Sequence, residues 1–166
     1  MNKEKTNRVL EYFDELFPDA YCELNHESDF QLLVAVMLSA QTTDKKVNQL
    51  TENLFKKYPT VEAVSQASLP ELEQDIKTIG LYRNKAKNLL ALSHVLIEQF
   101  DGIVPSDQKQ LESLPGVGRK TANVVRSVAF DIPAFAVDTH VERISKRLGF
   151  AKRDDNVLTV EKKLCR

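Results

Sequence analysis

A short stretch in the second half of the chain, residues 111–125, sets the tightest limit on the fold. It reads Leu-Glu-Ser-Leu-Pro-Gly-Val-Gly-Arg-Lys-Thr-Ala-Asn-Val-Val. Pro115 removes a backbone donor and disfavours helical geometry at the residue before it, so a helix must end there. We expect Gly116 and Gly118 to adopt backbone angles or close approaches that a side chain would forbid. The stretch therefore predicts a helix, a tight turn and a second helix that begins near Gly118.

The start of this second helix is a candidate anion site. Free backbone N–H groups and the positive end of the helix dipole can hold a phosphate there. Arg119 and Lys120 lie in the first turn, where the dipole disfavours cations. Helix stability does not explain these two residues, and an anionic partner is the natural candidate.

Apolar residues recur at helical spacing along the rest of the chain, and proline or glycine ends several of the runs. The expected helices, apart from the hairpin pair, cover residues 4–17, 30–38, 44–58, 61–66, 70–77, 83–100, 138–148 and a last segment from about 158. We expect Asp29 and Asp44 to be the N-caps of the second and third. Residues 30–38 are apolar nearly all round, which predicts a central buried helix. Because no alternating strand pattern competes, the predicted fold class is all-α.

Composition limits the class of protein without identifying it. The chain is 42% hydrophobic and 28% charged, as in ordinary soluble proteins. It has no apolar run near the ~20 residues of a membrane helix and no secretory signal, so we expect a cytoplasmic location. Cys22 and Cys165 share no zinc-ligand or redox spacing, which favours free thiols.

The net charge of −1 conceals an uneven distribution. Residues 116–166 hold 11 Lys and Arg against 6 Asp and Glu, so the rest of the chain is acidic. An asymmetry of this kind can create one basic face on a nearly neutral protein. It can equally reflect solvated helix faces, and charge alone does not decide between the two.

Four segments together resemble the endonuclease III family of helix-hairpin-helix DNA glycosylases. They are Leu-Ser-Ala-Gln-Thr-Thr-Asp at 38–44, Ile-Gly-Leu-Tyr-Arg-Asn-Lys-Ala at 79–86, the hairpin itself, and Phe-Ala-Val-Asp-Thr-His-Val at 135–141. The resemblance runs along essentially the whole chain in the family's order and spacing. It implies two helical lobes with a cleft between them, the HhH-GPD glycosylase fold. One lobe is a six-helix barrel at 22–132 with the hairpin, and the other joins 1–21 to 133–166.

Lys120 has two interpretations. Its spacing alone favours a lysine that contacts phosphate. The resemblance implies instead that it is the nucleophile of a bifunctional glycosylase and AP lyase. Such an enzyme removes oxidised pyrimidines from duplex DNA in base excision repair and cleaves the abasic site by β-elimination. An amine attacks only when uncharged, and a position in a cleft at a helix N-terminus favours that state.

Asp138 directly precedes an expected helix, so its residue type suits an N-cap. The resemblance implies the catalytic aspartate of the family. Its carboxylate would stabilise the oxocarbenium-like charge as the base departs, or help to deprotonate the lysine. The two roles can coexist.

Gln41 and Leu81 correspond to side chains that fill the space left by the nucleotide that the family extrudes from the duplex. Without the resemblance, Gln41 would be a polar residue at a helix C-terminus and Leu81 a core contact of the next helix. Further DNA contacts are expected from the hairpin and from basic side chains. These are Gly116, Val117, Gly118, Arg119, Lys146, Arg147, Lys152 and Arg153.

The family also implies cofactors. Its members usually carry a [4Fe–4S] cluster, held by four cysteines spaced roughly C-x6-C-x2-C-x5-C after the last helix. Those cysteines are absent from the 166 residues, so we expect a chain shortened before the cluster loop. Hairpin carbonyls around Leu114 and Val117 are candidates for a monovalent cation, as in many such hairpins.

The expected partner is duplex DNA that contains damaged pyrimidines or abasic sites, bound by a monomer, and not a membrane. Two alternatives to the enzyme stay open. One is a helix-hairpin-helix fragment that binds DNA without catalysis, and the other is a truncated, inactive product.

Overall fold

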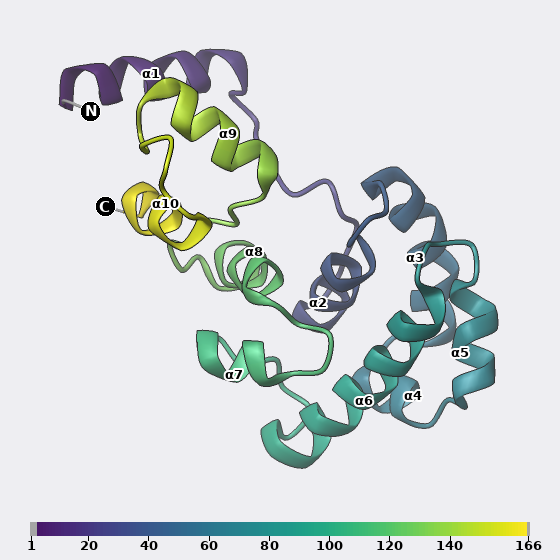
Figure 1. Ribbon diagram of the computed structural model, residues 1–166. Helices are drawn as coiled ribbons and strands as arrows, with labels where there is room; N and C mark the ends of the chain where they lie inside the picture. Colours follow the sequence, from purple (N-terminus) through teal and green to yellow (C-terminus); the bar gives the residue numbers. More distant parts are fainter. Residues whose placement is uncertain (1–2, 166) are drawn as a thin grey trace. The chain divides into compact units, whose positions relative to one another are not determined.

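The computed structural model describes residues 3–165, and the regular elements within them are all helices (Figure 1). The all-α prediction is confirmed. The chain divides into two compact units. Glu23–Ala134 forms one unit, and the terminal segments up to Cys22 and from Phe135 form the other. Among the described residues, no helix has both the length and the apolar composition to cross a bilayer.

The unit Glu23–Ala134 is built around one buried helix. Its helices are α2 (Asp29–Leu38), α3 (Asp44–Lys57), α4 (Val61–Ser65), α5 (Leu69–Ile76), α6 (Tyr82–Phe100), α7 (Gln108–Ser113) and α8 (Arg119–Phe130). Every residue from Phe30 to Leu38 is buried, as the nearly all-apolar sequence predicts. In Figure 1, α2 lies next to α8, and these two helices are in contact.

The longest helix, α6, turns one apolar stripe toward the core. Leu89, Leu92 and Leu96 are fully buried, at the four- and three-residue spacing of a helix face. This helix packs against α4 and α5 and also contacts α2. Burial of a leucine side chain stabilises the folded state by roughly 1.5–3 kcal/mol, so the stripe accounts for much of the packing of this unit.

Two helix N-caps differ from the prediction by one residue. The hydroxyls of Ser28 and Thr43 accept the amide three residues further on, at 3.2 and 3.4 Å. Asp29 and Asp44 are instead the first residues of α2 and α3, where a carboxylate favours the positive end of the dipole. The predictions that Asp29 and Asp44 are the caps were wrong.

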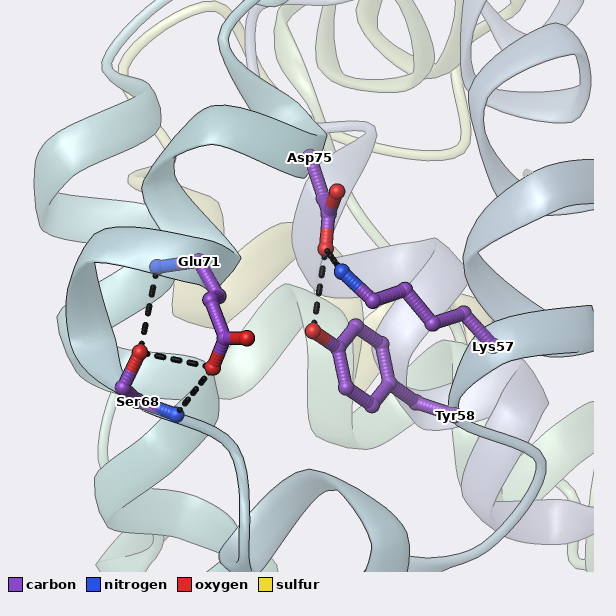
Figure 2. Close-up of polar contacts among 5 residues, drawn as sticks. All are labelled: Lys57, Tyr58, Ser68, Glu71 and Asp75. Carbon is purple, nitrogen blue, oxygen red and sulfur yellow. Dashed lines mark hydrogen bonds and ion pairs between the residues drawn. The ribbon is translucent and has the colours of Figure 1, made fainter.

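Polar contacts tie α3 to α5 (Figure 2). The Tyr58 hydroxyl and the Lys57 ammonium both donate to Asp75 Oδ2, at 3.0 and 2.8 Å. At the start of α5, Ser68 Oγ accepts the Glu71 N–H, while Glu71 Oε2 accepts the Ser68 N–H. This reciprocal pair is a capping box, which satisfies two backbone donors at once.

The terminal unit contains α1 (Lys3–Leu16), α9 (Thr139–Leu148) and α10 (Val157–Leu164). Its core is small and is formed by Val137, Ala151 and Val160. No residue of α1 is buried, although its apolar residues have helical spacing. The exposed ones include Leu10, Phe13 and Leu16.

Candidate functional site

The hairpin forms as the sequence predicts. Helix α7 ends at Ser113, and Leu114 is extended at φ −73°, ψ 139°, as expected of a residue before proline. Gly116 turns the chain with φ +78°, in the left-handed region that favours glycine. Gly118 is the N-cap of α8. The chain thus reverses within a few residues and presents the start of α8.

The two hairpin glycines are required for different reasons. A Cβ on Gly116 would lie 2.9 Å from Asn88 Cβ on α6, so this glycine is needed for both its conformation and its space. Gly118 has an ordinary φ of −97°, and nothing lies within 4 Å of a Cβ built on it. The prediction that a side chain is forbidden at Gly118 is therefore wrong for the protein alone.

A glutamine holds the two hairpin helices together. Gln108 Nε2 donates to Glu112 on its own helix and to buried Asn123 on α8, at 2.7 and 3.1 Å. Its Oε1 accepts from Arg126 Nη1 at 2.9 Å. Val117 is buried and donates its N–H to the Leu114 carbonyl. Its side chain and amide are therefore used inside the hairpin, and its contact with DNA stays a prediction.

Arg119 and Lys120 are the first two residues of α8, and both side chains are exposed. No side chain caps this helix, so its first amides keep the polarity that binds anions. Arg119 also lies 3.5 Å from Glu112 of α7. The predicted position of Lys120 at a helix N-terminus is confirmed, and its position in a cleft stays a prediction.

Gln41 and Leu81 share an unusual backbone conformation. Both have φ +57°, in the left-handed region, and both are exposed. The other described non-glycine residues with positive φ are Asp101 and Asp131, a residue type that tolerates this region. Leu81 is 56% exposed, so its alternative interpretation as a core contact was wrong. Strain held by bulky residues on the surface is typical of functional sites.

Sequence reasoning gave no role to Lys85, although it lies within one of the four motifs. Its side chain is buried and its ammonium donates to three oxygens of residues 38–42. A signal was available in the sequence. Lys85 falls on the apolar stripe of α6, four residues before Leu89, where a lysine breaks the pattern.

Asp138 belongs to the terminal unit and caps α9. Its Oδ1 accepts the N–H groups of His140 and Val141, at 2.9 and 2.8 Å. The N-cap interpretation is confirmed. The catalytic role, and the pairing of Asp138 with Lys120 from the other unit, stay predictions.

The basic residues of the terminal unit differ in their availability. Lys146 donates to Glu142 at 2.6 Å and is only partly exposed. Arg147, Lys152 and Arg153 are exposed. Their contacts with DNA stay predictions.

The residues present do not fit an iron–sulfur cluster. The chain has two cysteines, Cys22 and Cys165, and both are free thiols. The described part of the chain has no group of three or more His, Cys, Asp or Glu side chains placed to share a metal ion. Four thiolates are needed for such a cluster, so no chemistry is assigned to one here. The monovalent cation at the hairpin stays a prediction.

The sequence from residue 34 to 166 matches the HhH-GPD superfamily of base excision DNA repair proteins. All four motifs lie within that range. The endonuclease III of Bacillus subtilis (strain 168) is 56% identical over 166 residues, which are 100% of this chain and 76% of that relative. The chain belongs to the endonuclease III family. It spans about three quarters of the length of this relative.

Solved structures agree with the family assignment. A trapped endonuclease III–DNA covalent intermediate, in an estranged-adenine complex, is 57% identical, with a TM-score of 0.93. The match covers 99% of this chain and 77% of the solved one. A thermostable thymine-DNA glycosylase is 24% identical, with a TM-score of 0.84 over 98% of this chain and 78% of its own. At that identity the second likeness shows the fold alone, and the fold is that of the HhH-GPD glycosylases.

Proposed function

We propose that this chain is a bifunctional DNA glycosylase and AP lyase that removes oxidised pyrimidines from duplex DNA and cleaves the resulting abasic site. The observation that carries the proposal is Lys120. It lies at the second position of an uncapped helix, directly after the hairpin, in a chain 57% identical to an enzyme trapped as a covalent DNA intermediate. An exposed amine beside a phosphate-binding helix start can reach a deoxyribose carbon.

The proposed reaction begins when the uncharged Lys120 Nζ attacks C1′ of the damaged nucleoside. The C1′–N bond breaks and the base leaves with the bonding electrons and takes up a proton. The nitrogen then forms an imine with C1′ as the sugar ring opens. The imine acidifies the C2′ proton, and loss of that proton expels the 3′ phosphate by β-elimination. Asp138 supplies the carboxylate that stabilises the positive charge on the sugar as the base departs.

The remaining residues bind and distort the duplex. Gln41 and Leu81 are exposed and fill the space of the extruded nucleotide, which offsets part of the few kcal/mol lost in stacking and pairing. The hairpin backbone at Gly116 and Gly118, together with Arg119, binds phosphates. Lys146 and Arg147 add DNA contacts from α9. Lys146 must first break its ion pair with Glu142 to contact DNA.

Borohydride trapping tests the nucleophile. A duplex with one thymine glycol is incubated with the chain, and borohydride reduces any imine to a stable amine that links protein to DNA. We expect an adduct with the wild-type chain and none with Lys120→Gln. Lys109→Gln is a matched control, because Lys109 is also exposed and is also the second residue of a hairpin helix, α7.

Two results would contradict the proposal. An undiminished adduct with Lys120→Gln would assign the chemistry to another amine. A wild-type chain that binds the damaged duplex and yields neither adduct nor nicked strand would instead be a helix-hairpin-helix module without catalysis.

A further inference from the structure

We propose that Lys85 is a positioning residue that ties the turn carrying Gln41 to the first turn of α6, which begins at Leu81, so that both side chains enter a duplex together. The inference rests on the proposed function for its DNA step. The structural part rests on contacts within the unit Glu23–Ala134 alone.

The ammonium group of Lys85 is fully engaged. Nζ donates to the Leu38 carbonyl at 2.9 Å, the Ala40 carbonyl at 2.7 Å and Thr42 Oγ1 at 3.1 Å. A lysine has three N–H donors, so three oxygens match its capacity. The side chain is only 6% exposed. All three acceptors lie more than 40 residues away in the sequence, at the last residue of α2 and in the turn that follows it.

These contacts enclose Gln41. Lys85 binds the residue before it and the residue after it, and the Thr42 N–H closes the turn on the Ser39 carbonyl at 3.0 Å. The backbone of Gln41 is thereby held at φ +57° with its side chain exposed. An unsupported glutamine would leave this conformation readily, because the left-handed region is unfavourable for it by roughly 1–2 kcal/mol.

The backbone of the same residue contacts the Leu81 turn. Its backbone N–H donates to the Leu81 carbonyl at 3.0 Å, which closes the first turn of α6. Leu81 is the N-cap of that helix and has no side-chain cap of its own. One residue therefore contacts both strained turns, through its backbone on one side and its ammonium on the other.

One turn further along α6, Asn88 packs against Gly116 of the hairpin. The segment 81–88 thus begins at the Leu81 turn and contacts both the Gln41 turn and the hairpin. An apolar residue at position 85 would extend the buried stripe, and burial of a charge is unfavourable by comparison. Burial of the lysine charge is unfavourable, but the ammonium group fixes the conformation of the turn that carries Gln41.

A purely structural role is the rival explanation. A cation at the C-terminus of α2 satisfies late helix carbonyls and interacts favourably with the dipole. The two roles differ in what Lys85→Met should do to DNA discrimination. Methionine keeps an unbranched stem that fills much of the same space and removes every ammonium donor.

The test measures binding of the 166-residue chain to two duplexes, one undamaged and one with a tetrahydrofuran abasic analogue. We expect Lys85→Met to weaken binding to the abasic duplex by about 10- to 100-fold, the scale of a misplacement near 1 Å. Binding to the undamaged duplex, which depends on phosphate contacts, should stay within about two-fold. Amide hydrogen exchange at Thr42 should accelerate.

Two further variants separate positioning from stability. Leu92→Ala removes a fully buried side chain from the same helix, so it destabilises the fold and should leave the discrimination ratio unchanged. Gln41→Ala combined with Lys85→Met should bind no more weakly than Gln41→Ala alone, because the lysine acts through the glutamine.

Several results would overturn the inference. They are a Lys85→Met chain that discriminates as well as wild type, an equal loss of discrimination in Leu92→Ala, and additive effects of the two substitutions in the double variant. A wild-type chain that discriminates and yields no borohydride adduct would refute the proposed catalysis and leave this inference standing. A wild-type chain that binds neither duplex would refute both.

Discussion

Replacement of Gly116 by alanine should destabilise the hairpin through two separate effects. The first is conformational, because Gly116 has φ +78° and an L-residue in the left-handed region loses about 1–2 kcal/mol. The second is steric, because the new Cβ would lie 2.9 Å from both Cβ and Nδ2 of Asn88. Rotation of the Asn88 side chain moves Nδ2 away and leaves its Cβ in place. One of the two overlaps must therefore be relieved by the backbone.

Overlap of this kind in a packed site typically adds about 1–3 kcal/mol. The sum predicts that Gly116→Ala lowers the free energy of unfolding by roughly 2–5 kcal/mol, a large part of the 5–15 kcal/mol typical of a domain. Gly118→Ala is the matched control from the same turn. Its φ is ordinary and its Cβ meets open space, so it should lose less than about 1 kcal/mol, mainly because alanine is a poorer N-cap than glycine.

Denaturant unfolding followed by circular dichroism measures both variants against wild type. The double variant Gly116→Ala/Asn88→Gly separates the two effects. It should recover the steric part and keep the conformational part, after correction for Asn88→Gly alone. If Gly116→Ala unfolds within about 0.5 kcal/mol of Gly118→Ala, the usual spread of surface substitutions, the close packing of α6 against the hairpin is refuted. Gly118→Ala should bind DNA more weakly than wild type although it is nearly as stable, because its Cβ would intrude on a bound phosphate.

Three further predictions concern single side chains. Asp138→Ala should lower stability by about 0.5–2 kcal/mol through loss of its two capping bonds, whereas Asp138→Asn should keep the cap, lose less than about 1 kcal/mol and abolish strand cleavage. Unfolding curves and a nicking assay measure both, and cleavage by Asp138→Asn would leave only the capping role. Leu81→Gly should raise stability by about 1 kcal/mol, because glycine tolerates φ +57°, and should weaken binding to an abasic duplex; a loss of stability would show that the turn is not strained. The Ser68 hydroxyl and amide hold the Glu71 pKa below its ordinary value of 4.5, so the stabilisation is present above pH 4.5 and is lost as the pH falls through the lowered pKa. Glu71→Gln should therefore lose less stability than wild type on acidification, and parallel pH profiles would contradict this.

Most helices could be predicted from the sequence because local signals bound them. Proline and glycine set the ends of several helices, and apolar spacing set their buried faces. The caps of α2 and α3 were missed because Ser-Asp and Thr-Asp pairs each offer two acceptors in adjacent positions. The serine or threonine hydroxyl accepts the capping hydrogen bond. The aspartate carboxylate lies in the first turn of the helix, where its charge interacts favourably with the helix dipole. Residue type alone cannot separate these two arrangements.

The site was predicted in part, and the rest depends on contacts between distant segments. Lys120 at the start of α8 and Asp138 before α9 follow from turn chemistry and the family motifs. The left-handed conformations of Gln41 and Leu81 do not, because glutamine and leucine ordinarily avoid that region. The Gln41 turn is supported by Lys85, whose side-chain bonds cross more than 40 residues of sequence. The only sign of such a bond in the local sequence is a lysine at a position of the apolar stripe.

The helices that begin without a side-chain cap are the ones that matter most for the proposed function. Ser, Thr, Asp or Asn side chains cap α2, α3, α4, α5, α7, α9 and α10. Among the helices whose N-caps are described, α6 and α8 lack such a bond and begin at Leu81 and Gly118. A cap at either position would contribute about 1 kcal/mol of stability, so its absence needs a reason. At Gly118 a capping side chain would occupy the amides that the proposal assigns to phosphate, and at Leu81 a short polar residue could not fill the space of an extruded nucleotide. The departures from local stability rules thus coincide with the predicted DNA contacts, as expected where function opposes stability.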